Sequence, residues 1–167
     1  LAITQAEYSI CVISGNFVQR GEPALVNKWA RCRMALNAGI DLCIELPIIY
    51  CVQSAEFFAY GAVSILNALG IVDFISFGSE TGNIGLIKKI AEIISKEPEE
   101  YKNYLKDEVK MGNSFASSRA NAIAKYLKAQ GSLDIEEEYL KSALQSSNNI
   151  LGLEYVKWLY RLNSTIK

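Results

Sequence analysis

Three short apolar runs, separated by helical patterns, constrain the fold of this sequence more than any other feature. The runs cover residues 8–13, 42–46 and 74–77, and each is followed by a turn-forming residue. Short runs rich in β-branched and aromatic residues predict buried strands. They begin at residues 8, 42 and 74, and a strand–helix–strand unit needs about 30 residues. We therefore expect an α/β fold, a Rossmann-like parallel sheet with helices on both faces.

Apolar residues at helical spacing fill the intervals between these runs. Gly39 and Gly70 follow the first two stripes, which favours a helix end at each position. The stripes are Trp29, Cys32 and Leu36; then Ala55, Phe58, Ala62, Ile65 and Leu69; then Ile84, Ile87, Ala91 and Ile94. From residue 97 onward the sequence predicts helices alone. We therefore expect a Rossmann-like nucleotide-binding part over residues 1–96 and a helical extension over residues 97–167 that packs on it.

The helices of this extension have their own start signals. Pro98 precedes Glu99 and Glu100, and carboxylates in a first turn favour the helix dipole. Asp134 and Glu137 are spaced as a capping box. Their residues at helical spacing are Phe115, Arg119, Ala122 and Tyr126; then Ile135, Tyr139, Leu140 and Leu144; then Leu151, Tyr155, Trp158 and Leu162.

The composition excludes several kinds of chemistry. The 167 residues contain no histidine, so this chain supplies no Ser-His-Asp triad, no Cys-His pair and no histidine metal ligand. The 17 basic and 18 acidic residues give a net charge of −1, so no global basic field attracts nucleic acid. The four cysteines form no C-x-x-C motif, and we expect small buried thiols in the reducing cytoplasm. No apolar run is long enough to cross a membrane, and the N-terminus is not typical of a signal peptide.

Candidate ligand-binding residues follow the predicted strands, because ligands of an open parallel sheet bind beyond the carboxyl ends of its strands. Ser14, Gly15, Asn16 and Arg20 follow the first run, and Gly78 follows the third. Glycine turns that lead into helices can hold phosphates, and an arginine can clamp them. The alternatives are tight turns for the glycines and a solvated loop charge for Arg20.

Two further candidates lie in the helical part. Arg119 lies near the start of a predicted helix, among residues with hydroxyl groups, and could bind phosphates. The alternative is that this segment only caps the helix. Asn148 and Asn149 precede the last helix and could cap it or bind a ligand.

The second strand and the first helix carry charges that need an explanation. Glu45 lies within an otherwise apolar run and could position a cation, a ribose or Arg20, or form a buried structural pair. Lys28, Arg31 and Arg33 form a small basic cluster, which we interpret as a solvated helix face rather than an RNA contact.

Long segments of the sequence resemble the bacterial tRNA(Met) cytidine acetate ligase family, which is nucleotidylyltransferase-like and belongs to the HIGH superfamily. The resemblance covers nearly the whole chain in the same order. It rests on SGNFVQRGEPALVNKWARCRMAL at residues 14–36, DLCIELP at 41–47, QSAEFFAYGAVSIL at 53–66, FGSE at 77–80 and NNILGLEYVK at 148–157.

The resemblance implies a cytoplasmic enzyme that activates acetate with ATP as acetyl-adenylate. The acetyl group then passes to the wobble cytidine of elongator tRNA(Met). It implies ATP and Mg²⁺ as cofactors, and Gly78 and Asn148 as ATP contacts. The helical extension would complete the ATP site, and we expect no membrane partner.

This sequence departs from the family pattern at its start. Family members begin with a strand and an H-x-G-H loop whose histidines hold the ATP phosphates, and we expect this segment to precede Leu1. A tRNA-binding part is expected beyond Lys167. The catalytic residues are therefore not identified, and we expect these 167 residues to be inactive alone. The alternatives are another nucleotidylyltransferase, acting on a phosphorylated small molecule, and a non-catalytic nucleotide- or RNA-binding remnant.

Overall fold

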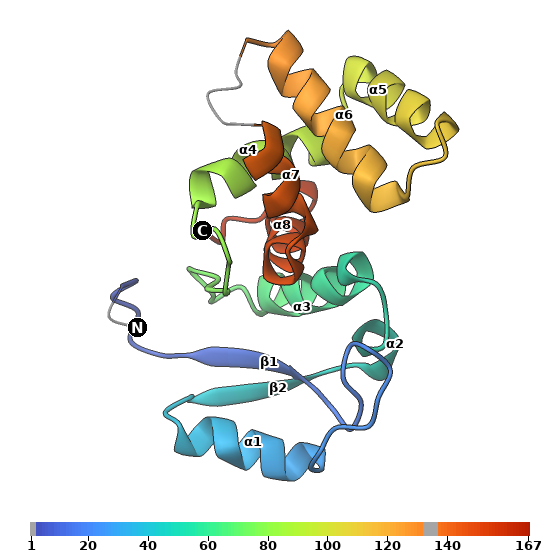
Figure 1. Cartoon of the computed structure of the whole chain (residues 1–167). Helices are drawn as coiled ribbons and strands as arrows, with labels where there is room; N and C mark the ends of the chain where they lie inside the picture. The colour runs from blue at the N-terminus through green and yellow to red at the C-terminus, as the bar shows by residue number, and fades with distance from the viewer. Residues whose placement is uncertain (1–2, 132–136) are drawn as a thin grey trace. The chain divides into compact units, whose positions relative to one another are not determined.

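The computed structural model describes residues 3–131 and 137–167 (Figure 1). They form two compact units. Residues up to Ile75, together with Ser164–Lys167, make the first unit, and Ser76–Asn163 make the second. The division by function, into residues 1–96 and 97–167, stays a prediction.

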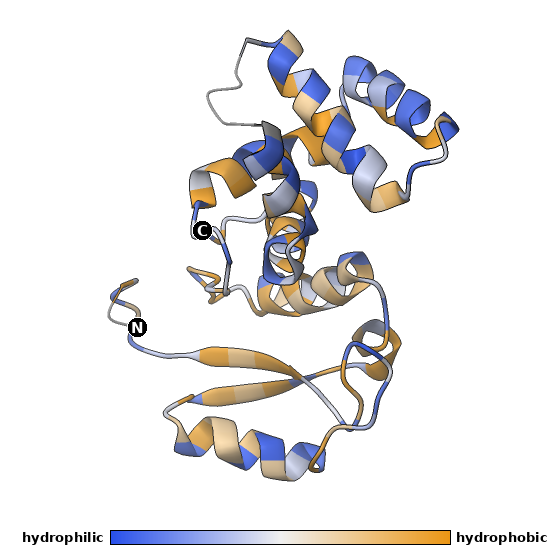
Figure 2. Cartoon of the chain, viewed as in Figure 1, coloured by the Kyte–Doolittle hydropathy of each residue, from blue (hydrophilic) through white to orange (hydrophobic). Residues whose placement is uncertain are grey.

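The first unit contains a two-stranded parallel sheet. Strand β1 (Ile10–Ser14) pairs with β2 (Leu42–Leu46), and the register runs from Ile10 opposite Leu42 to Ser14 opposite Leu46. Figure 2 shows hydrophobic residues along both strands. The parallel pairing predicted from the apolar runs is confirmed, and β2 has the predicted bounds. Strand β1 begins two residues later than predicted, because its pairing with β2 starts at Ile10, opposite Leu42.

The third predicted strand, at residues 74–77, is wrong: these residues form no strand. The N–H of Ile75 donates to the carbonyl of Lys167 at 2.9 Å, and the N–H of Lys167 donates to the carbonyl of Asp73 at 2.9 Å. A strand needs a ladder of such bonds to a neighbour. Within the described residues, this segment makes its backbone bonds to Lys167 alone, so its extended backbone is not continued into a sheet.

Three helices accompany the sheet in the first unit. They are α1 (Lys28–Asn37), α2 (Ile48–Cys51) and α3 (Ala55–Leu69). In the view of Figure 1, α1 lies below the two strands and α3 above them. Both predicted glycine ends are confirmed, since Gly39 and Gly70 have φ of +100° and +67°. Helix α3 approaches β2 closely, because a Cβ added at Gly61 would lie 3.0 Å from Leu46 Cδ1.

The predicted apolar stripe of α1 is not a core face. Helix α1 has no buried residue, and the side chains of Trp29 and Leu36 are exposed. The helix covers only two strands, which are too narrow to bury a whole stripe. Of the stripe predicted for α3, only Ala62 is buried, and the other buried residues of this helix are Ala59, Gly61 and Val63.

Free thiols lie together between the strands and α1. Cys11 and Cys43 are register partners, and their Sγ atoms are 3.4 Å apart. Burial raises the pKa of the Cys43 thiol, and a hydrogen bond with Cys43 raises the pKa of the Cys32 thiol. Thiols with raised pKa values stay protonated at neutral pH. In the part of the chain that the structure describes, no group of three His, Cys, Asp or Glu side chains could hold a metal.

The second unit consists of helices within the described residues. Its elements are α4 (Ile84–Lys96), α5 (Glu99–Lys110), α6 (Phe115–Ala129), α7 (Glu137–Gln145) and α8 (Ser147–Arg161). Helix α4 packs against α8, and α5 packs against α6. Pro98 precedes α5, as predicted. The predicted capping box falls on Asp134, which lies outside the described residues.

The core of this unit confirms some predicted stripes and corrects one. Ile87, Ala91 and Ile94 of α4 are buried, as predicted. In α8 the predicted stripe of Leu151, Tyr155, Trp158 and Leu162 is wrong. The buried face of α8 carries apolar and polar residues, namely Asn149, Gly152, Leu153, Glu154, Val156 and Lys157. Charged residues occupy this face because they pair within the unit, and periodicity of apolar residues alone does not show such pairs. None of the described helices is long and apolar enough to cross a bilayer.

Candidate functional site

The carboxyl end of β1 is tied to the start of α1 by backbone and side-chain bonds. Ser14 and Gly15 are buried, and Asn16 follows them. The side-chain Oδ1 of Asn16 accepts from the N–H of Lys28 at 3.0 Å, and its backbone carbonyl accepts from the N–H of Ala24 at 2.8 Å. Asn16 therefore holds both the loop after β1 and the first turn of α1.

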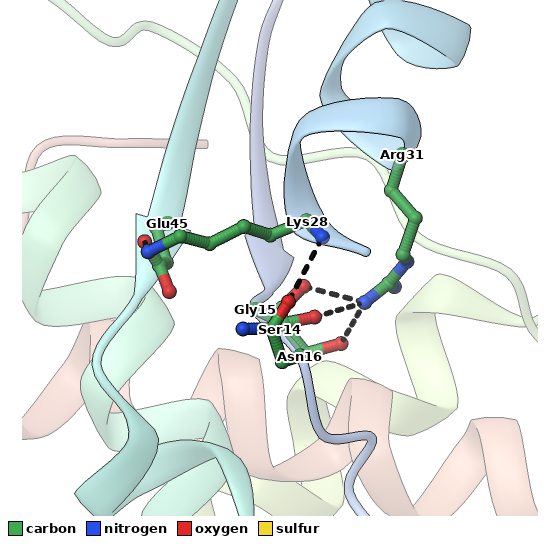
Figure 3. A network of polar contacts seen from close by, with 6 residues as sticks. All are labelled: Ser14, Gly15, Asn16, Lys28, Arg31 and Glu45. Atoms are coloured by element: carbon green, nitrogen blue, oxygen red, sulfur yellow. Dashed lines mark hydrogen bonds and ion pairs between the residues drawn. The ribbon is translucent and has the colours of Figure 1, made fainter. Parts of the chain in front are cut away.

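Two basic side chains of α1 point toward the strands: Figure 3 shows Arg31 at the end of β1 and Lys28 at Glu45 of β2. The Nη1 group of Arg31 donates to the carbonyl of Ser14 at 2.5 Å, to Ser14 Oγ at 3.1 Å and to the carbonyl of Gly15 at 2.8 Å. The Nζ group of Lys28 donates to Glu45 Oε2 at 2.7 Å. The interpretation of this cluster as a solvated helix face is thus wrong for Lys28 and Arg31, whereas Arg33 is exposed.

Glu45 forms a structural pair, but not a buried one. Its side chain is 49% exposed and pairs with Lys28, not with Arg20. It also lies close to the backbone of Gly15, where an added Cβ would lie 2.3 Å from Glu45 Oε1. A residue larger than glycine at position 15 would therefore displace the carboxylate from Lys28.

Arg20 lies in the turn after β1. The N–H of Val18 donates to the carbonyl of Glu22 at 2.9 Å, and the N–H of Gly21 donates to the carbonyl of Val18 at 2.9 Å. The guanidinium of Arg20 is exposed and bonds to no residue in the described ranges, 3–131 and 137–167. Its role as a phosphate contact stays a prediction.

In the second unit, the loop after Gly78 is bonded to the first turn of α8. The carboxylate of Glu80 accepts from the N–H of Asn148 at 3.0 Å and from the N–H of Asn149 at 2.8 Å. Asn148 and Asn149 thus lie inside the helix rather than before it. The cap of α8 comes from a residue that is far away in the sequence.

The side chain of Asn149, on the helix, also bonds to the loop. Its Oδ1 accepts from Ser79 Oγ at 2.6 Å and from the N–H of Glu80 at 3.1 Å. Its Nδ2 donates to the carbonyl of Ala143 at 3.0 Å, and its side chain is buried. Asn149 therefore fixes the loop that presents Gly78 and the helix turn that presents Asn148.

The aromatic ring of Phe77 anchors the same loop. It lies on α8 at Gly152, where an added Cβ would be 2.3 Å from Phe77 Cε2. The ring centroid of Phe77 is 5.8 Å from that of Tyr155. Gly78 itself is exposed, and an added Cβ there would meet no atom within 4 Å. Open space thus remains beside a fixed loop.

We expect the Glu80 cap to make folding more favourable above pH 4.5 than below it. The N–H of Asn148 is the main cause that lowers the pKa of the Glu80 carboxyl from its ordinary value of 4.5. A group whose pKa is lowered by folding contributes stability above its unfolded pKa and loses it as the pH falls through the folded value. The Glu80→Gln variant should therefore show a shallower loss of unfolding free energy in acid.

Urea unfolding from about pH 3 to about pH 6 measures this difference. The matched control is Glu22→Gln, whose exposed carboxylate bonds to no described residue. The control should follow the wild-type acid profile. Identical profiles for wild type and Glu80→Gln would show that the cap does not bind the ionised carboxylate.

A group of charged side chains lies on the buried face of α8. Arg119 Nη1 donates to Glu154 Oε1 at 2.9 Å, and Lys157 pairs with Glu154 Oε2. The side chains of Arg119 and Glu154 are 14% and 3% exposed, and that of Lys157 is 3% exposed. Arg119 as a nucleotide contact stays a prediction, and its Nη1 is already engaged by Glu154.

Sequence reasoning missed the partners of these candidate residues. Glu80, Glu154 and Lys157 were not singled out, and the i, i+3 spacing of Glu154 and Lys157 indicates only that they share a helix face, not that they are buried. The remaining contacts join residues distant in the chain, and no local pattern points to them.

The family described as HIGH Nucleotidyl Transferase matches residues 1–167. A relative from Clostridium perfringens, named tRNA(Met) cytidine acetate ligase, is 55% identical over 99% of this chain and 41% of its own length. A relative of the same name from Halothermothrix orenii is 49% identical over 99% of this chain and 39% of its own length. This chain therefore spans 39% to 41% of these two curated relatives.

A solved structure shares the fold. It is Thermotoga maritima TmcAL bound with alpha-thio ATP, with a TM-score of 0.94 and 40% sequence identity. The match covers 99% of this chain and 39% of that chain. The predicted nucleotidyltransferase-like α/β fold is thereby confirmed.

Proposed function

This chain belongs to the HIGH nucleotidyl transferase family, and from that premise we propose that it is part of an ATP-dependent ligase that acetylates a cytidine of tRNA. The substrates are acetate and the wobble cytidine of elongator tRNA(Met). The observation that carries the proposal is the 55% identity, over 99% of this chain, to a relative named tRNA(Met) cytidine acetate ligase.

The proposed reaction has two steps. An acetate oxygen attacks the α-phosphorus of ATP, and pyrophosphate leaves as acetyl-adenylate forms. The exocyclic amine of the cytidine then attacks the acetyl carbonyl, and AMP leaves with loss of one proton. Both steps depend mainly on positioning and on stabilisation of negative charge.

The residues of the second unit fit a nucleotide contact. Gly78 has open space beside it, and the loop that carries it is held by Asn149. The side-chain amide of Asn148 bonds to no residue in the described part of the chain, so it is available to a ligand. Its backbone N–H is occupied by Glu80. We therefore assign the ATP contact of Asn148 to its side chain.

In the first unit, taken by itself, the proposed ATP contacts are Ser14, Gly15, Asn16 and Arg20. The exposed guanidinium of Arg20 is suited to a phosphate. Mg²⁺ fits this proposal as an ion held by ATP phosphates and water, since no group of three carboxylate, cysteine or histidine side chains among the described residues could hold a metal. Such an ion neutralises phosphate charge. We propose a cytoplasmic protein, because its tRNA substrate is there.

The test uses the protein that contains this chain. Acetate-dependent exchange of pyrophosphate into ATP measures the first step, and incorporation of labelled acetate into tRNA(Met) measures the second. We expect both, and we expect no incorporation into a control tRNA with uridine at the wobble position. Exchange that requires a phosphorylated small molecule instead of acetate would favour the broader nucleotidyltransferase alternative. Binding of tRNA without exchange would favour a non-catalytic RNA-binding protein.

A further inference from the structure

The guanidinium of Arg31 is held in one orientation by the end of β1. Its Nη1 group bonds to three oxygens, two of them backbone carbonyls of the buried residues Ser14 and Gly15 (Figure 3). Backbone carbonyls at a strand end move little, so they fix the plane of the guanidinium. The Nε and Nη2 groups have no partner in residues 3–131 and 137–167.

These two free groups form one edge of the guanidinium. Nε–H and the adjacent Nη2–H point in parallel, at the spacing of two oxygens of a carboxylate or a phosphoryl group. The orientation of Arg31 therefore leaves unbonded, within the described residues, the edge that makes bidentate bonds to an oxyanion. A lysine at this position would offer no such edge.

The charge of Arg31 is not neutralised by the described parts of the chain. The neighbouring carboxylate, Glu45, pairs with Lys28 at 2.7 Å. The partners of Arg31 are neutral oxygens, and its side chain is half-buried. A partly desolvated cation without a counter-charge favours the arrival of an anion.

The position of Arg31 agrees with ligand binding. Its guanidinium lies at the carboxyl end of β1, the edge at which parallel sheets bind their ligands. We propose that Arg31 binds an oxyanion, the carboxylate of a small acid or the phosphoryl group of a nucleotide, through Nε and Nη2. This proposal rests on the proposed function only for the identity of the oxyanion that binds.

Chemical modification tests the site in the whole protein without an activity assay. Phenylglyoxal modifies accessible arginine side chains, and peptide mass spectrometry resolves Arg31 from Arg33. Sodium acetate and inorganic phosphate are the two probes, with sodium chloride at the same ionic strength as control. We expect one probe to slow modification of Arg31 by about tenfold, because bidentate charge-assisted bonds occupy Nη2, one of the two terminal nitrogens that phenylglyoxal attacks. Arg33, exposed on the same helix, should react at an unchanged rate.

The pattern of protection distinguishes the two kinds of oxyanion. Protection by acetate identifies a carboxylate, and protection by phosphate identifies a phosphoryl group. Protection of neither, equal protection of Arg33, or an Arg31 that does not react in the free protein would each overturn the proposal, since the open edge is its basis.

Kinetics of the Arg31→Lys and Arg33→Lys variants separate this proposal from the proposed function. Arg31→Lys keeps the charge but loses the edge, so KM for the bound oxyanion should rise about tenfold while the other KM is unchanged. Arg33→Lys should match the wild type. If Arg31→Lys has wild-type KM values and the acetate-dependent pyrophosphate exchange is intact, the oxyanion site at Arg31 is refuted but the proposed function is not. Protected Arg31 in a protein without acetate-dependent exchange would refute the function alone.

Discussion

The Glu154→Gln variant is expected to lower the free energy of unfolding by about 3–5 kcal/mol, because it removes the one charge shared by two buried cations. Glu154 pairs with Arg119 at 2.9 Å and with Lys157, and the side chains of Glu154 and Lys157 are each 3% exposed. A glutamine fills nearly the same space but carries no charge. The cost therefore comes from leaving Arg119 and Lys157 without their shared carboxylate.

Urea unfolding measured at neutral pH checks this expectation. The matched control is Glu92→Gln, which removes the exposed pair with Lys96 and should cost less than about 0.5 kcal/mol. Adding Lys157→Met to Glu154→Gln should restore at least about 1 kcal/mol, because a buried cation that has lost its carboxylate is then removed. A cost near that of Glu92→Gln would show that water or a rearranged side chain neutralises the two cations.

The Asn149→Ala variant is expected to weaken ATP binding by at least about tenfold, because the loop that carries Gly78 loses its link to α8. Asn149 Oδ1 accepts from Ser79 Oγ and from the N–H of Glu80. Its Nδ2 donates to the carbonyl of Ala143. Alanine leaves these buried groups without partners, so we also expect a loss of about 2–3 kcal/mol in unfolding free energy.

Calorimetric titration with ATP, beside urea unfolding, separates the two effects. The matched control is Asn103→Ala on α5, where the exposed amide bonds to no described residue, and neither quantity should change. Asn149→Asp keeps an acceptor for the loop but loses the donor to Ala143. We therefore expect its ATP affinity to lie between those of Asn149→Ala and wild type. Wild-type affinity in a folded Asn149→Ala would refute the positioning role.

Local patterns predicted the elements well where local physics decides them. Helix α3 ends at Gly70 because only a residue without Cβ readily adopts its φ of +67°. The apolar face of α4 is visible as periodicity, and Ile87, Ala91 and Ile94 are buried as predicted. The run at residues 74–77 shows the limit, because an apolar segment becomes a strand only if a neighbour continues its ladder.

The contacts within the candidate sites could not be predicted from local sequence patterns. Glu80 and Asn149 are 69 residues apart, and Arg119 and Glu154 are 35 apart. Glu80, Asn149 and Glu154 lie in motifs that carry the family resemblance, but no periodicity joins the two members of either pair. The predicted stripe of α8 failed for the same reason, since Glu154 is charged and buried at once. Hydrophobicity treats such a residue as exposed unless its partners are known.

The sequence by itself determined the parallel α/β class of the first unit, the helical character of the second, and the resemblance to a nucleotidyltransferase-like family. These follow from apolar periodicity, turn residues and long ordered motifs, which are properties of neighbouring residues. Only the tertiary structure decided that Arg31 holds one guanidinium edge open, that Glu80 caps α8, and that Glu154 is shared by two cations. Those features depend on bond distances between residues far apart in the chain, and folding alone brings such residues within bonding distance.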